Sequence, residues 1–176
     1  MTSLAESPYF PDDAFADVFG ANARYAESFE DAHLTGKALR GLAVVTCMDS
    51  RLEPLAILGM KPGDVKIIRN AGARVTEDVL RTLVLATHLL GVTRVLVMPH
   101  TDCRMASGTE AEIHAEIFAA SGVDTRAIEI RTIRDQLAAL ELDVTRIRAF
   151  PLLKTGVEVG GALYDVLTGT LTAIPC

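Results

Sequence analysis

The sequence lacks the features of several specialised protein classes. Its three cysteines are an odd number, and its first residues show no basic region followed by an apolar run, so neither a signal peptide nor a disulfide framework is expected. It contains no basic run, and its net charge of -6 disfavours nucleic acid, whose phosphates require clustered cations. The longest apolar stretches are too short to span a bilayer. We expect a cytoplasmic protein that binds neither nucleic acid nor membrane.

The chain is long enough for one domain with a substantial core. Of its 176 residues 49% are apolar and 23% charged, which is ordinary for a globular protein. No repeat, linker or low-complexity tract divides it, so a single domain over residues 1–176 is predicted. Residues 12–30 have helical periodicity and no obvious packing surface within the chain. We therefore predict a helical arm over residues 1–40 and an α/β core over residues 41–176.

Apolar runs that could be buried on both faces alternate with helical patterns along the core. This order predicts a mainly parallel central sheet flanked by helices, with an antiparallel strand at its C-terminal edge. Strands are predicted at residues 42–47, 65–68 and 93–99, and as two segments within 156–174. A helical turn is predicted at residues 54–58, and helices at residues 76–90, 109–120 and 132–142.

Reactive side chains follow two of the predicted strands. Cys47, Asp49 and Arg51 occupy alternate positions at the end of the first strand, and alternate side chains of an extended chain share a face. His100 and Cys103 follow the strand that ends near Pro99. Parallel strands place their carboxyl ends at one edge of a sheet, which is where sites form in such folds. The two groups should therefore meet.

Two thiolates and one imidazole suit zinc, and three protein ligands leave a fourth position open. No fourth Cys or His is well placed to close the site. We interpret His33, His88 and His114 as surface or satisfied core imidazoles, and Cys176 as an incidental exposed thiol. The alternative is that Cys47 is a small buried apolar residue and Cys103 a loop thiol.

These motifs carry a resemblance to a known family. Cys47-Met48-Asp49-Ser50-Arg51 with His100-Thr101-Asp102-Cys103 resembles the zinc motif of the β-class carbonic anhydrases, in their compact bacterial branch. Residues 68–72, Ile-Arg-Asn-Ala-Gly, and residues 161–169 are similar to two further segments of that family. The likeness extends over about residues 42–174.

The resemblance implies a zinc lyase that reversibly hydrates carbon dioxide to bicarbonate and a proton. Zinc would be held by Cys47, His100 and Cys103, and zinc-bound hydroxide would attack the substrate. It also implies a homodimer or dimer of dimers in which the N-terminal helix packs on the partner subunit. The substrate pocket is expected to include Asn70, Ala71, Gly72 and Arg104.

The resemblance gives Asp49 two possible roles. It could orient the zinc-bound water as a hydrogen-bond acceptor, or become the fourth metal ligand and close the site. Arg51 would hold it off the metal, so Asp49 and Arg51 are the predicted catalytic pair.

The sequence departs from the family at Arg104 and Ala73, where Gly is frequent. Arg104 could crowd the metal loop, add positive charge to the pocket or point into solvent.

Other functions remain open at this point. Relatives hydrolyse carbonyl sulfide or carbon disulfide on the same zinc site, and pocket shape cannot be derived from sequence. A non-catalytic zinc-stabilised interaction protein would need neither Asp49 nor Arg51. A nucleotide-binding domain is disfavoured because no glycine-rich phosphate motif follows any strand. The chain has no tryptophan, which excludes the Trp-containing bicarbonate regulatory pocket of some family members.

Overall fold

The computed structural model describes residues 10–176, which divide into two compact units, one ending at Leu34 and one running from Thr35 to Cys176. The first unit holds helix α1 (Asp12–Glu27) and a 3₁₀ turn (Asp31–His33). The helix predicted there is confirmed, although it ends three residues before Glu30. None of the residues of α1 is buried, and its apolar side chains include the exposed Phe15 and Phe19.

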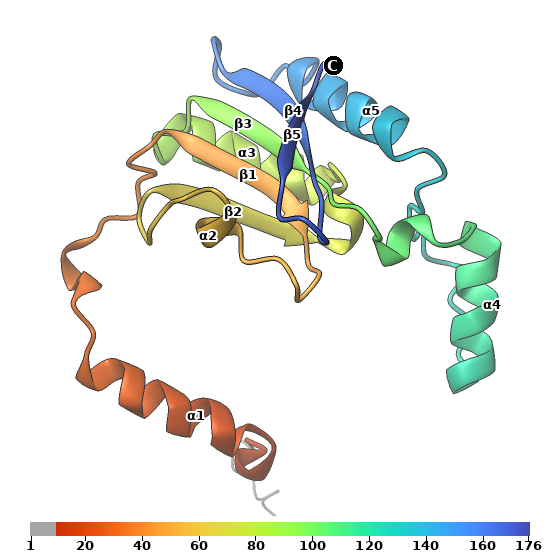
Figure 1. The fold of residues 1–176 in the computed structure, drawn as a ribbon, viewed down its shortest axis with the longest axis horizontal. Coiled ribbons are helices and arrows are strands. Elements are labelled where there is room, and N and C mark those ends of the chain that lie inside the picture. Colours follow the sequence, from red (N-terminus) through yellow and green to blue (C-terminus); the bar gives the residue numbers. More distant parts are fainter. Residues whose placement is uncertain (1–9) are drawn as a thin grey trace, which may run out of the picture. The chain divides into compact units, whose positions relative to one another are not determined.

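The second unit is built on a five-stranded sheet in the order β2-β1-β3-β4-β5 (Figure 1). The strands are β1 (Leu42–Cys47), β2 (Val65–Asn70), β3 (Arg94–Met98), β4 (Glu158–Tyr164) and β5 (Leu171–Ile174). The first four are mutually parallel, and β5 pairs antiparallel to β4. The predicted α/β class, with a mainly parallel sheet and an antiparallel C-terminal pair, is confirmed.

Strand β1 is central and buried along its whole length, as its continuous apolar run predicts. Its alternate residues enter two different core clusters. Ala43 and Val45 pack with side chains of α3 (Glu77–Leu89) and α5 (Gln136–Arg148), whereas Leu42 and Val44 pack with those of the short helix α2 (Pro54–Ile57). Helices therefore cover both faces of β1, and this packing fixes the position of its carboxyl end.

Capping residues that can be recognised in the sequence determine where two of the helices begin. The Thr76 side chain accepts a hydrogen bond from the amide of Val79 at the start of α3. Thr109 and Glu112 form a reciprocal capping box at the start of α4 (Glu110–Ser121). Because such caps are local in sequence, both helices begin within one residue of their predicted positions.

Helix α5 was predicted at residues 132–142, and this was wrong at both ends. The helix begins at Gln136 because Asp135 caps the amides of Leu137 and Ala138. Ile133 lies before the helix, outside any helix or strand, and is buried. The helix continues to Arg148 because Val144 and Ile147 extend its buried face by another turn.

Two other expectations are corrected. Strand β2 was predicted to end at residue 68, but it continues to Asn70, which pairs with Cys47, and the chain turns at Ala71–Ala73. Cys176 is only partly exposed, since it packs against the main core cluster and its thiol donates to the carbonyl of Ile174 at 3.3 Å. No helix within residues 10–176 has the length and apolar character needed to cross a bilayer.

Candidate metal centre

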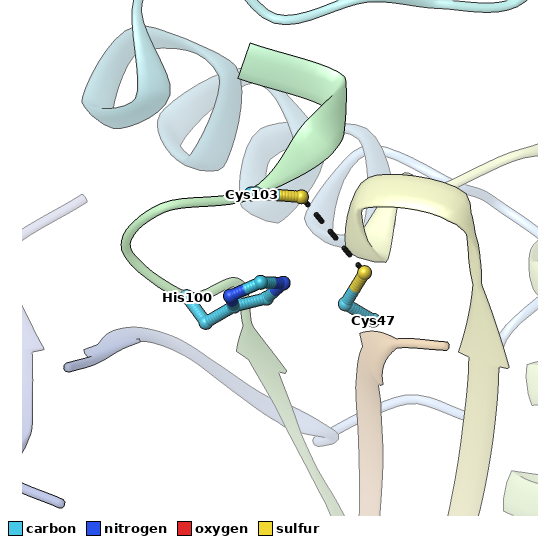
Figure 2. A group of neighbouring side chains, drawn as sticks. All are labelled: Cys47, His100 and Cys103. Atoms are coloured by element: carbon cyan, nitrogen blue, oxygen red, sulfur yellow. Dashed lines mark hydrogen bonds between the residues drawn. The ribbon is translucent and has the colours of Figure 1, made fainter. Parts of the chain in front are cut away.

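Two neighbouring strand ends bring the predicted ligands together. Strands β1 and β3 are parallel neighbours, with Thr46 opposite Met98, so Cys47 and His100 leave the same edge of the sheet. The Thr46 hydroxyl donates to the carbonyl of Met98 at 2.7 Å and fixes the two strand ends to each other. Cys103 returns from the loop after β3, and Figure 2 shows the three side chains converging.

The three side chains have the geometry of a metal site. Their ligand atoms all lie within 4.8 Å of one another, and the two sulfurs are 3.9 Å apart. Two thiolates on a tetrahedral zinc ion, each at about 2.3 Å, would be about 3.8 Å apart. All three residues are buried, with exposed fractions of 4%, 0% and 5% for Cys47, His100 and Cys103. The residues present therefore fit zinc.

His100 provides the most specific sign that the cluster suits a cation. Its Nδ1 lies 2.7 Å from the carbonyl of Thr101, which can only accept, so Nδ1 carries the proton and donates. The other nitrogen, Nε2, then has a free lone pair, and it is buried without any hydrogen-bond partner. Buried polar atoms are rarely left unpaired, and a metal bond would satisfy this one.

The two thiols are electrostatically coupled. A hydrogen bond from Cys103 lowers the pKa of Cys47 to about 3, with support from His100 and the Gly72 amide and against the effect of burial. The pKa of Cys103 is raised because its thiol donates a hydrogen bond to the Cys47 thiolate and because the thiol is buried. Burial lowers the pKa of His100, but the negative charge of the nearby Cys47 thiolate and the Thr101 carbonyl outweigh it and raise that pKa. A divalent cation would replace the proton that these groups share.

Asp49 lies beside the cluster and is held by Arg51. Arg51 donates from Nε to Oδ1 at 3.0 Å and from Nη2 to Oδ2 at 2.8 Å. These hydrogen bonds hold the pKa of the Asp49 carboxyl well below its usual range. Oδ2 lies 3.8 Å from Nε2 of His100, yet Asp49 is not part of the group of mutually close ligand atoms. In this arrangement Arg51 holds Asp49 beside the ligand cluster and not within it.

Asp102 holds the other side of Arg51. The Arg51 guanidinium donates from Nη1 to the Asp102 carboxylate at 2.8 Å and from Nη2 to the Asp102 carbonyl at 3.0 Å. Asp102 adopts a left-handed conformation with φ of 53°. Because Asp102 lies between His100 and Cys103, Arg51 links the two halves of the motif.

Sequence reasoning missed a contribution from Arg69. This β2 residue donates from Nε to the carbonyl of Cys47 at 2.9 Å and from Nη2 to the carbonyl of Asp49 at 2.6 Å. It thus fixes the backbone on both sides of Met48. Its position in the segment Ile68–Gly72 marked it as part of a motif, but no local pattern indicated which carbonyl groups it would bind.

A cavity of about 410 Å³ opens beside the cluster. Of the four residues predicted to form a substrate pocket, Ala71, Gly72 and Arg104 line it, together with Cys47, Asp49, Arg51 and Cys103. Asn70 does not line it, because its side-chain amide is hydrogen-bonded to the backbone of Arg74.

Arg104 directs its guanidinium toward helix α4. It donates to the Ser107 hydroxyl at 2.6 Å and to the carboxylate of Glu116, while its side chain remains 63% exposed. The charge of Arg104 is therefore paired at the margin of the cavity. Ala73, the other departure, is buried and has a left-handed φ of 58°, which a glycine would adopt without strain.

The remaining histidines lie outside the cluster. Nδ1 of His33 is 3.1 Å from the Glu30 carbonyl. His88, in α3, contacts the carbonyl of Leu152 through Nε2, and the buried His114, in α4, pairs with the Thr125 hydroxyl. Within residues 10–176, no fourth Cys, His, Asp or Glu joins the group formed by Cys47, His100 and Cys103.

Comparison with known proteins gives concordant matches. The sequence profile of the family described as "Carbonic anhydrase" matches residues 42–171. Beta-carbonic anhydrase 1 of Mycobacterium tuberculosis is 32% identical over 159 residues, which cover 90% of this chain and 96% of that protein. A carbonic anhydrase structure from Streptococcus mutans superposes with a TM-score of 0.86 at 34% identity, over 96% of this chain and all of that one. A carbon disulfide hydrolase of Acidianus sp. is 29% identical over 75% of this chain and 76% of that protein.

Proposed function

The chain belongs to the β-carbonic anhydrase family of lyases, and from this premise we propose that it catalyses the zinc-dependent, reversible hydration of carbon dioxide to bicarbonate and a proton. The observation that carries this proposal is the buried cluster of two thiols and one imidazole, in which Nε2 of His100 has no partner. The coupled thiols and the unpaired nitrogen together form a ligand set suited to a divalent cation.

Cys47, His100 and Cys103 would hold the zinc ion. When bound, zinc acts as a Lewis acid that lowers the pKa of a coordinated water from 15.7 to about 7 in favourable sites, and so makes a nucleophile available at neutral pH. The two thiolate ligands offset the charge of the ion, so help from neighbouring groups is expected. The nearest such group is the carboxylate of Asp49.

Asp49 orients the attacking water. Its carboxylate is kept ionised by Arg51 and lies close to His100, so it can accept a hydrogen bond from a water beside the ligand cluster. A water held in this way keeps a lone pair directed toward the substrate carbon. Arg51 binds both oxygens of Asp49, which keeps the carboxylate from serving as a ligand itself.

The decisive experiment is stopped-flow proton release on mixing the zinc-loaded protein with dissolved carbon dioxide, scanned over pH. We expect rapid release that increases with pH. A protein with stoichiometric zinc and no activity at any pH would contradict the proposal. A purely structural zinc site would instead show chelator-induced unfolding with no enzymatic activity to lose.

Hydrolysis of carbon disulfide or carbonyl sulfide is the second candidate, because the homologue from Acidianus sp. is a carbon disulfide hydrolase. The cavity beside the cluster has more apolar than polar character, with Ala71, Gly72 and Met105 among its lining residues. Sulfide release measured against proton release in the same preparation separates the two substrates. Faster turnover of the sulfur compound would make hydrolysis the function.

We further propose that the protein acts as a cytoplasmic homodimer or dimer of dimers. Support comes from α1, which buries none of its residues and exposes Phe15, Val18 and Phe19. An apolar helix face of this kind is normally covered by another surface. A partner subunit would provide such a surface.

A further inference from the structure

A buried ion pair connects helix α5 to the loop beneath the metal ligands. Nε of Arg74 lies 2.7 Å from Oδ2 of Asp143, and the two side chains are only 14% and 4% exposed. We propose that Arg74 and Asp143 are positioning residues of the metal centre, which hold the Gly72 amide on the sulfur of Cys47. This inference rests on the proposed zinc site and assigns a function to residues outside its ligand set.

The loop between Asn70 and Arg74 is closed by two reciprocal hydrogen bonds. The Asn70 side-chain amide donates to the Arg74 carbonyl at 2.7 Å, and the Arg74 amide donates to Asn70 Oδ1 at 2.9 Å. Between them, Gly72 and Ala73 both have left-handed φ angles, of 78° and 58°. A left-handed alanine is sterically unfavourable, so the loop needs contacts that hold it in place.

Gly72 carries the functional contact of this loop. Its amide lies 3.4 Å from the sulfur of Cys47 and donates to it. Gly72 is buried tightly, because a Cβ atom at this position would lie 3.0 Å from Cγ of Met105 and 3.3 Å from Cδ1 of Ile133. This close packing leaves Gly72 little room to move, so its amide stays on the sulfur of Cys47 as long as the loop stays where Arg74 places it.

Helix α5 reaches both halves of the ligand cluster. Asp143 binds Arg74, and Gln136, seven residues earlier and on the same helix face, donates from its side chain to the carbonyl of His100. One rigid element thus supports the loop that contacts Cys47 and the backbone of His100. A shift of α5 would change both supports together.

Stability alone does not explain the ion pair. Replacing a buried ion pair with apolar side chains of similar volume is often neutral or stabilising. A hydrogen bond to a metal-bound thiolate, in contrast, withdraws charge from the sulfur, and groups that contact ligands from outside typically change metal affinity by about 10- to 100-fold. The pair Arg74–Asp143 is therefore expected to affect the metal more than the fold.

The test replaces the ion pair with an apolar pair and examines the metal. The Arg74→Met/Asp143→Leu variant and the wild type are loaded with zinc for chelator competition, and with cobalt(II) for the sulfur-to-metal charge-transfer band. The matched control is Arg81→Met/Asp78→Leu, which removes an ion pair whose side chains are 66% and 74% exposed. Thermal unfolding of the metal-free proteins is measured in parallel.

We expect the buried-pair variant to remain folded, to bind zinc about tenfold more weakly and to show a shifted charge-transfer band, while the control matches wild type. A folded variant with wild-type zinc affinity and an unshifted band would overturn the inference. If the double variant does not fold, Asp143→Asn decides in the same way, since it keeps the shape of the side chain and removes its charge. If the wild type itself binds no zinc, the proposed zinc-dependent function fails. If the wild type binds zinc and the folded variant binds it equally well, only the positioning role of Arg74 and Asp143 fails.

Discussion

Arg51 binds both carboxylate oxygens of Asp49, at 3.0 Å from Nε to Oδ1 and at 2.8 Å from Nη2 to Oδ2. The same guanidinium also binds the side chain and the carbonyl of Asp102. Arg51 therefore sets the direction of the Asp49 carboxylate, which lies beside the proposed metal position.

Replacing Arg51 with alanine should preserve zinc and abolish most of the hydration activity. Without the two hydrogen bonds, Asp49 can rotate toward the metal, and misplacement of a reacting group by about 1 Å can reduce turnover by about 100-fold. Proton release and elemental analysis on the same sample measure both effects. The control is Arg81→Ala, which removes an arginine from an exposed ion pair on α3. Wild-type turnover in Arg51→Ala would refute the role of Arg51.

The ion pair also makes stability depend on pH. Because Arg51 depresses the pKa of Asp49, the ionised carboxylate should stabilise the fold above its unfolded-state pKa of about 3.9, and this contribution should be lost as the pH falls through the lower folded-state pKa. We expect urea unfolding of metal-free wild type and Asp49→Asn to differ most near neutral pH and to converge in acid. The pair is partly exposed, so the difference should stay below about 1 kcal/mol. A constant difference across this range would contradict the prediction.

Removing one thiolate should remove the metal. Cys103→Ala leaves Cys47 and His100 as the only members of the cluster, and two ligands hold zinc poorly. We expect substoichiometric zinc by elemental analysis after dialysis against a mild chelator. Cys176→Ala is the matched control, because Cys176 lies in the C-terminal core contact, and it should retain full zinc. Stoichiometric zinc in Cys103→Ala would exclude Cys103 as a ligand.

Two left-handed glycines allow packing to be separated from backbone strain. Gly59→Ala introduces a side chain at φ of 61° into open space, and should destabilise the fold by about 1–2 kcal/mol. Gly72→Ala introduces similar strain at φ of 78° and adds a close contact with Met105, so a further 1–3 kcal/mol is expected, as is roughly typical of overpacking. Urea titration of the metal-free proteins measures both. Equal losses would show that the core around Gly72 adjusts easily.

The exposed face of α1 predicts self-association. Phe19→Glu places a charge within an aromatic group in which the ring centroids of Phe10 and Phe19 are 5.5 Å apart. We expect sedimentation analysis of the full chain to show a dimer or larger assembly in wild type and a smaller species in Phe19→Glu. Gly20→Glu adds the same charge on the opposite face of α1, where a side chain meets open space, and serves as the control. A monomeric wild type would exclude the proposed assembly.

Much of the fold was predictable because its signals are local. Residues 42–47 form a strand with the predicted bounds, since small and β-branched apolar residues suit a buried central position. Thr76 and Thr109 fix the starts of two helices through their own side chains. The end of β2 and both ends of α5 were missed, because pairing with β1 and packing on the sheet decide them.

The sequence by itself determined the ligand types. Cys47, Asp49 and Arg51 follow one strand and His100 and Cys103 another, and parallel pairing predicts that they meet at the carboxyl ends of the strands. Only the tertiary structure decided how they are supported. The contacts of Arg69 with the carbonyls of Cys47 and Asp49, of Arg104 with Glu116, and of Arg74 with Asp143 join residues 12 to 69 positions apart. No periodicity encodes such pairs, because the direction of a long, flexible side chain is set by the partner that the fold brings within its reach.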